Sequence, residues 1–87
     1  MRRKKIRGPL TLATVAQHRA TFLEGEGSPL WVDLGAVDEL DTAGLQLLLA
    51  AHRRRGLRVE GASAAVLEVF RLLRLEEHFL GSPARER

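Results

Sequence analysis

The chain has 87 residues, a net charge of +3 and no cysteine. This length allows one small domain with little room for a deep catalytic cleft. The absence of cysteine excludes disulfides, thiolate metal sites and cysteine nucleophiles, and it is consistent with a cytoplasmic protein. The longest fully apolar run, Leu47–Ala51, is far shorter than a transmembrane segment, so we expect no membrane span.

Positive charge is concentrated at the N-terminus, where Arg2, Arg3, Lys4, Lys5 and Arg7 precede every motif. Without these cations the rest of the chain has a small net negative charge, which is not typical of a nucleic-acid-binding module. We therefore expect no specific nucleic-acid partner. We interpret residues 1–7 as a solvated basic segment, with contact to nucleic acid or anionic lipid as the alternative.

The first expected elements are a strand and a helix. Ile6–Leu10 is interrupted by a glycine and a proline, which predicts a weak or edge strand. Apolar residues then recur at helical spacing over residues 12–23, and Thr11 or Thr14 is expected to cap this helix. A loop rich in glycine follows.

The second strand is expected at Leu30–Leu34, which is bulky and partly β-branched. A helix is then predicted to begin at Asp41 or Thr42 and to run to about Arg55. Gly56 follows directly, as a glycine that ends a helix should.

The third strand is expected at Leu57–Glu60, and residues 75–80 are expected to form a short helix or turn. Between them we predict a helix that is capped by Ser63 and has an apolar inner face of Val66, Leu67, Phe70 and Leu73. Alternating strands and helices predict an α/β fold with a mainly parallel sheet. We expect residues 8–80 to form a single domain and residues 81–87 to be a frayed tail.

The connection before the second helix carries the most information about function. Ala43 and Gly44 leave the first helical turn with little side-chain cover, and the glycine suggests that another group approaches the backbone closely. Thr42 would place a hydroxyl at a helix N-terminus, where a phosphate is favourable locally. A phosphate would also add about −1.5 to −2 charge beside an acidic turn and so repel a docked partner. The alternative is that Thr42 only caps the helix.

The segment from Val37 to Leu45, Val-Asp-Glu-Leu-Asp-Thr-Ala-Gly-Leu, follows a strand that ends in Asp-Leu and precedes an apolar helix. This pattern resembles the STAS domain, whose members include anti-sigma-factor antagonists and the MlaB subunit of a bacterial phospholipid ABC transporter. The resemblance is strongest over residues 30–61 and extends from Leu10 through Leu75. It implies a small mixed, mostly parallel sheet with helices packed mainly on one side. The N-terminal strand region is short for this family, so an incomplete first hairpin is expected to leave an edge open to another chain, including a homodimer partner.

The resemblance implies that Thr42 occupies the position of the phosphorylated serine or threonine of the antagonists. In the transporter subunit, the matching hydroxyl residue lies at the contact with the ATPase. We therefore expect a protein-binding regulatory module that docks on a kinase-like ATPase, with Thr42 as a phosphorylation switch. Its expected contact residues are Asp38, Asp41, Ala43, Gly44 and Leu45. The alternatives are an MlaB-like subunit that contacts the ATPase of a phospholipid ABC transporter, and an accessory of a bacterial signalling array.

No catalytic arrangement emerges from the sequence. There is no Ser-His-Asp ordering and no acid/base pair, so we expect a protein that is not an enzyme. The three histidines, His18, His52 and His78, lack the spacing of metal ligands. The acidic residues Asp33, Asp38, Glu39 and Asp41 are better explained as a solvated turn than as a cation site. We expect neither a metal nor a cofactor.

Overall fold

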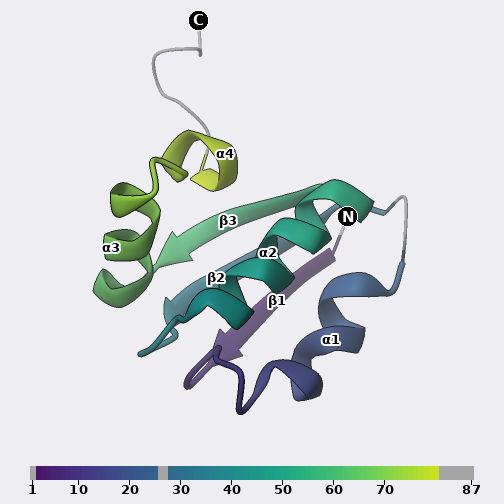
Figure 1. The fold of residues 1–87 in the computed structure, drawn as a ribbon. Coiled ribbons are helices and arrows are strands. Elements are labelled where there is room, and N and C mark those ends of the chain that lie inside the picture. The colour runs from purple at the N-terminus through teal and green to yellow at the C-terminus, as the bar shows by residue number, and fades with distance from the viewer. Residues whose placement is uncertain (1, 26–27, 81–87) are drawn as a thin grey trace, which may run out of the picture.

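Strands and helices alternate through the part of the chain that this computed structural model describes, residues 2–25 and 28–80. The elements in chain order are β1 (Arg2–Arg7), α1 (Val15–Leu23), β2 (Leu30–Ala36), α2 (Thr42–Arg55), β3 (Leu57–Ala62), α3 (Ala64–Leu72) and α4 (Glu76–Leu80). Figure 1 shows their arrangement. The frayed tail predicted at residues 81–87 lies outside the described residues. No helix of the described part is long and apolar enough to cross a membrane.

The strands form one open parallel sheet in the order β1-β2-β3, which confirms the α/β class. Trp31 in the central strand lies opposite Arg3 on one side and Arg58 on the other. Each pair of neighbouring strands is joined by a helical crossover, α1 or α2, as parallel strands require. The carboxyl ends of the strands therefore point the same way, and the connections that follow them meet at one end of the sheet.

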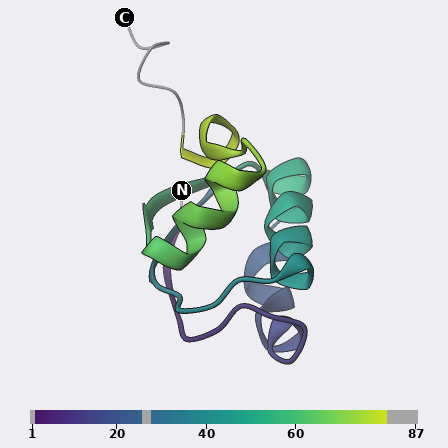
Figure 2. The ribbon, with the colours of Figure 1, turned by 60° about the vertical axis from the view of Figure 1, so that its left-hand side comes forward.

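The helices cover mainly one face of the sheet, as predicted. Leu30, Val32 and Leu34 alternate along β2 and are almost fully buried, whereas Trp31 between them is only half-buried. Strand β3 has the same alternation of buried and exposed residues. In Figures 1 and 2, α1 and α2 lie on the same side of the sheet. Because side chains of a strand point alternately to opposite faces, the second face of the sheet carries Trp31 and polar residues.

Strand β1 begins earlier than expected, and the interpretation of residues 1–7 as a solvated segment is wrong for Arg2–Arg7. These residues pair in parallel with β2 through the backbone, which does not depend on side-chain type. The side chains of Arg3, Lys4, Lys5 and Arg7 reach solvent from this edge strand, and basic residues are common at sheet edges. Ile6 of β1 enters the core, with 5% of its surface exposed. The strand ends at Arg7, and the next residue, Gly8, has a φ of 76°, which favours glycine. The assignment of residues 8–80 to a single domain stays a prediction.

Helix α1 begins later than the apolar pattern indicates. Thr14 occupies the N-cap position, but its side chain makes no capping hydrogen bond. Its hydroxyl instead accepts a hydrogen bond from the N–H of Thr11 at 3.0 Å and donates one to the carbonyl of Pro9 at 2.9 Å. These bonds stabilise the turn before the helix and leave Leu12 outside it, with 75% of its surface exposed.

The C-terminal helices pack at the β3 side of the sheet (Figure 1). Ser63 caps α3 as predicted, because its hydroxyl accepts a hydrogen bond from the N–H of Val66 at 3.2 Å. Phe70 and Phe79 are fully buried and stack on each other, with ring centroids 4.8 Å apart, so this pair attaches α4 to α3. Leu73 does not join the inner face as predicted and is 50% exposed, because α3 ends at Leu72.

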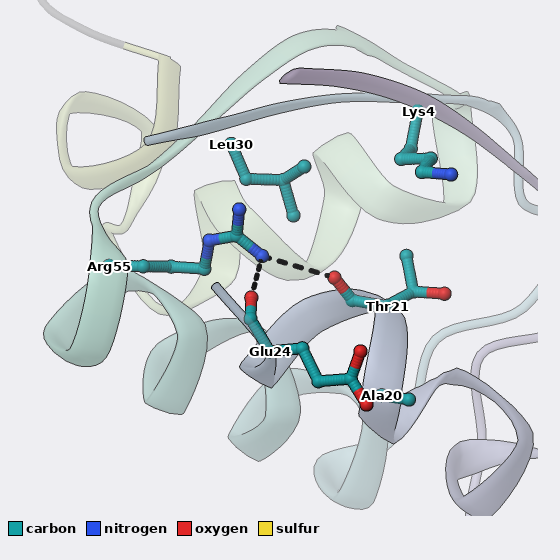
Figure 3. A pocket seen from close by; sticks show the side chains of 6 residues that line it. All are labelled: Lys4, Ala20, Thr21, Glu24, Leu30 and Arg55. Carbon is teal, nitrogen blue, oxygen red and sulfur yellow. Dashed lines mark hydrogen bonds between the residues drawn. The ribbon is translucent and has the colours of Figure 1, made fainter. Parts of the chain in front are cut away.

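Arg55 connects the ends of the two helices that cover the sheet. It lies in the last turn of α2, and only 6% of its surface is exposed. Its Nε donates to the carbonyl of Ser28 at 2.7 Å, and its Nη1 donates to the carbonyls of Thr21 and Glu24 (Figure 3). The last two carbonyls belong to the C-terminal end of α1, where the helix dipole favours a cation. One buried guanidinium therefore fixes α1, the following loop and α2 together.

Replacement of Arg55 should destabilise the fold. We expect Arg55→Met, which keeps most of the aliphatic volume, to lose about 2–3 kcal/mol of unfolding free energy, because the buried carbonyls lose a charged donor. The matched control is Arg53→Met, an exposed arginine in the same helical turn. Urea unfolding followed by circular dichroism measures both. An Arg55→Met protein as stable as the control would contradict this role.

Candidate functional site

The acidic turn between β2 and α2 lies at the carboxyl end of the sheet, next to the connection between β1 and α1. Leu10 and Leu40 form an isolated parallel bridge between the two connections. The N–H of Leu10 donates to the carbonyl of Glu39 at 2.8 Å, and the N–H of Asp41 donates to the carbonyl of Leu10 at 3.4 Å. The turn is therefore held in place by a segment that is about 30 residues earlier in the chain.

Asp41 is the N-cap of α2. Its Oδ1 accepts a hydrogen bond from the N–H of Gly44, and its Oδ2 accepts one from the N–H of Leu12, both at 3.0 Å. One carboxylate thus caps the helix and binds the neighbouring connection. Because these N–H groups favour the charged form, with the bond from Gly44 contributing most, the pKa of Asp41 is lowered from its ordinary value of 3.8.

Thr42 is the first residue of α2, and it is exposed. Since Asp41 provides the cap, the alternative that Thr42 acts only as the capping residue is wrong. Within the described residues, no hydrogen bond engages the hydroxyl of Thr42. The hydroxyl is therefore available at the surface, directly beside a carboxylate and a helix N-terminus.

The close approach expected at Gly44 comes from the chain itself. A Cβ atom on Gly44 would lie 2.0 Å from the carbonyl oxygen of Leu10 and 2.9 Å from Cδ1 of Leu40. Glycine is required here because the connection after β1 passes directly over the first turn of α2. The low helix propensity of glycine costs less free energy than the steric overlap that any side chain would create at this position.

The predicted contact residues differ in how far they reach the surface. Asp38 is exposed, Asp41 and Ala43 are half-buried, and Gly44 and Leu45 are buried. The structure places all of them, with Thr42, in and after one turn. Gly44 and Leu45 contribute to the packing beneath the surface. Of the predicted contact residues, only Asp38, Asp41 and Ala43 are therefore accessible to a partner. Their role in partner binding stays a prediction.

A shallow groove between α1 and α2 begins beside Thr42 and has a volume of about 290 Å³. Its apolar lining residues are Leu12, Val15, Leu23, Ala43, Leu47 and Ala50, and its polar ones are Arg19 and Gln46. We call it the α1–α2 groove. The sequence analysis did not predict this groove. The available signal was that both helices carry more apolar residues than one buried helix face requires.

Two of the histidines meet although they are far apart in the chain. The ring centroids of His52 on α2 and His78 on α4 are 4.1 Å apart, and both rings contact Phe79. Partial burial, followed by the proximity of His52, lowers the pKa of His78 from its ordinary value of 6.5. No third histidine, acidic or cysteine side chain of residues 2–25 and 28–80 joins them in a group that could hold a metal ion.

Comparison with known proteins gives one match. A family profile with the description "Mlab, STAS domain" matches residues 5–81. The chain belongs to this STAS domain family. No curated protein and no solved structure matches the chain.

Membership of the STAS family confirms the resemblance carried by the turn and by the start of α2. STAS domains are in general protein-interaction modules that do not catalyse reactions. This class of function is consistent with a surface site built from one exposed hydroxyl, an acidic turn and a shallow apolar groove.

Adding a methyl group at Gly44 should destabilise this STAS domain. A Gly→Ala change inside a helix ordinarily stabilises it, but the clash with Leu10 should reverse the sign and cost about 1–3 kcal/mol. Gln46→Ala, at an exposed position of the same helix, is the control. Thermal and urea unfolding of both variants test this, and a Gly44→Ala protein more stable than wild type would exclude the close contact.

The stability of the domain should depend on the charge of Asp41. A carboxyl with a lowered pKa stabilises the fold fully above its ordinary pKa and loses this effect as the pH falls through the folded-state value. We expect Asp41→Asn to be less stable than wild type at neutral pH and the difference to shrink below about pH 4. Urea unfolding across this range, with Asp38→Asn as the control, measures it. A difference that stays constant with pH would show that the charge is not involved.

Proposed function

We propose that this STAS domain binds an ATPase partner through the surface formed by Thr42, the acidic turn and the α1–α2 groove. The observation that carries the proposal is the exposed hydroxyl of Thr42. This hydroxyl does not cap the helix, because Asp41 is the N-cap. The groove adjoins it and supplies apolar area for a partner side chain.

The surface combines features that a docking site needs. Leu12 is an exposed apolar residue at one end of the groove, and Ala43 is a small one that allows close approach. Asp38 adds an exposed negative charge that can orient a basic partner surface. The bonds of Asp41 to Leu12 and Gly44 hold these elements in fixed positions before binding, which reduces the entropic cost of association.

The matching family description supports an ATPase of the ABC type as the partner, because it describes MlaB-like STAS domains. In this version Thr42 is a contact residue, and the protein is a subunit of a phospholipid transporter. The alternative is an anti-sigma-factor antagonist whose partner is a kinase-like ATPase that phosphorylates Thr42.

A phosphate on Thr42 would act mainly by repulsion. Asp41 already accepts a hydrogen bond from the N–H of Gly44 in the first turn, so this donor is not open to a phosphate. The added charge of about −1.5 to −2 would lie beside Asp41 and close to Asp38. The same surface can therefore serve as a contact when unmodified and lose affinity when phosphorylated.

A charge at position 42 should weaken partner binding about a hundredfold, which corresponds to about 3 kcal/mol of repulsion and lost contacts. The experiment is a pull-down from the native host with the wild-type protein and with Thr42→Glu as baits. Mass spectrometry identifies the partners that each bait retains, and the affinity of both proteins for the purified partner is then measured. Gln17→Glu adds the same charge at an exposed position of α1 and is the matched control. Full binding by Thr42→Glu would refute the role of this surface.

The identity of the partner separates the two versions. Retention of an ABC ATPase together with its membrane subunit supports the transporter subunit. Retention of a soluble histidine-kinase-like ATPase that phosphorylates the wild type but not Thr42→Val supports the antagonist. Failure to retain any ATPase would contradict both.

A further inference from the structure

Strand β1 presents an open edge. It pairs with β2 along one side, and no strand within residues 2–25 and 28–80 pairs with its other side (Figure 1). The outer backbone N–H and C=O groups of an edge strand can pair with a further strand. Peptide recognition by strand addition uses such an edge, with main-chain hydrogen bonds for affinity and side chains for selectivity.

The charge of this edge is of one sign. The described cationic side chains of β1 belong to Arg3, Lys4, Lys5 and Arg7, and all of them are exposed. Arg3 pairs with Glu60 across the sheet. Within the described residues, no carboxylate forms an ion pair with the other three cations. The edge thus combines backbone groups that no described strand pairs with and positive charge that no described carboxylate neutralises at Lys4, Lys5 or Arg7.

This charge decides between two kinds of added strand. A second copy of the chain pairing edge to edge would bring the cations of both β1 strands together, and close like charges are unfavourable. A homodimer through this edge is therefore disfavoured. An extended acidic segment would instead be attracted by the same cations. The charge pattern therefore favours binding of an acidic segment over self-association.

The two faces of an added strand would meet different surroundings. Ile6 and Lys4 point to the helix side of β1, and Arg3, Lys5 and Arg7 alternate with them toward the open face of the sheet. On the helix side, Lys4 borders a small hollow of about 160 Å³ next to Ala20 and Thr21 of α1 (Figure 3). A matching segment carries acidic side chains at alternate positions and small or β-branched ones between them.

We propose that the outer edge of β1 binds an extended acidic segment of a partner protein as an additional strand of the sheet. The binding uses backbone hydrogen bonds to β1 and charge pairing with Lys5 and Arg7. It does not depend on Thr42, which lies on α2.

The probe is a fluorescein-labelled peptide, acetyl-Glu-Val-Glu-Thr-Glu-Val-Glu-amide, titrated with the full chain and followed by fluorescence anisotropy. We expect saturable binding that weakens as the salt concentration rises, because exposed charges are screened. Lys5→Glu/Arg7→Glu should weaken it at least about tenfold. Arg53→Glu/Arg74→Glu has the same change in net charge at exposed sites away from β1 and should bind as wild type does.

Backbone pairing is tested with two N-methylated forms of the same peptide. In an extended strand, alternate N–H groups point to opposite edges. One form is methylated at its glutamate amides and the other at its valine and threonine amides. We expect one form to lose binding and the other to retain it. Equal binding by both forms would show that attraction is purely electrostatic and would overturn the proposal.

Trp31 gives a second readout. It is the single tryptophan of the chain and lies on β2, with the guanidinium carbon of Arg3 5.6 Å from its ring centroid. An acidic strand that attracts Arg3 should change the tryptophan emission. Unchanged emission at saturation, or equal affinity for a peptide with lysine in place of glutamate, would refute strand addition at β1. Dimerisation of the free chain that Lys5→Glu/Arg7→Glu abolishes would show a second copy as the occupant and would also refute it. Unchanged peptide binding by Thr42→Glu keeps this result separate from the function proposed above.

Discussion

The contact between the two connections at the carboxyl end of the sheet is the constraint on which the site depends. The carbonyl of Leu10 lies where a side chain of residue 44 would be, so glycine is required there. Asp41 completes the contact by accepting hydrogen bonds from Gly44 and Leu12. These interactions fix the start of α2 relative to α1, and they determine both the position of Thr42 and the shape of the groove beside it. A change in this contact would alter the whole surface at once.

A second consequence of the fold is that the sheet has one covered and one open face. The helices bury the inward residues of β2 and β3 and leave Trp31 between Arg3 and Arg58 on the other face. Such a sheet tolerates a basic edge strand, because long side chains can extend from the edge into solvent. None of the described strands pairs with the outer edge of β1.

The domain thus offers surfaces of different chemistry at different places. The site around Thr42 combines a hydroxyl, negative charge and a shallow apolar groove, as is suitable for a folded partner. The edge of β1 offers backbone groups and positive charge, as is suitable for an extended acidic segment. Both proposals therefore assign this STAS domain a role in recognition through contact and charge.

The sequence by itself determined the features that depend on neighbouring residues. The strands β2 and β3, the cap formed by Ser63 and the end of α2 at Gly56 follow from local hydrogen bonding and backbone preferences. For α2 the sequence left Asp41 and Thr42 as alternative caps, and the structure shows that Asp41 is the cap. Tertiary structure decided what depends on distant partners. Residues 2–7 show no apolar alternation and form a strand because they pair with β2. Of three consecutive arginines, Arg55 is the buried one because it donates hydrogen bonds to carbonyls at the end of α1. The spacing of Arg55 from Ala51 and Leu48 was the available signal for that burial. The partners in both cases are backbone groups, which every residue has, so the local side chains indicate such choices only in part.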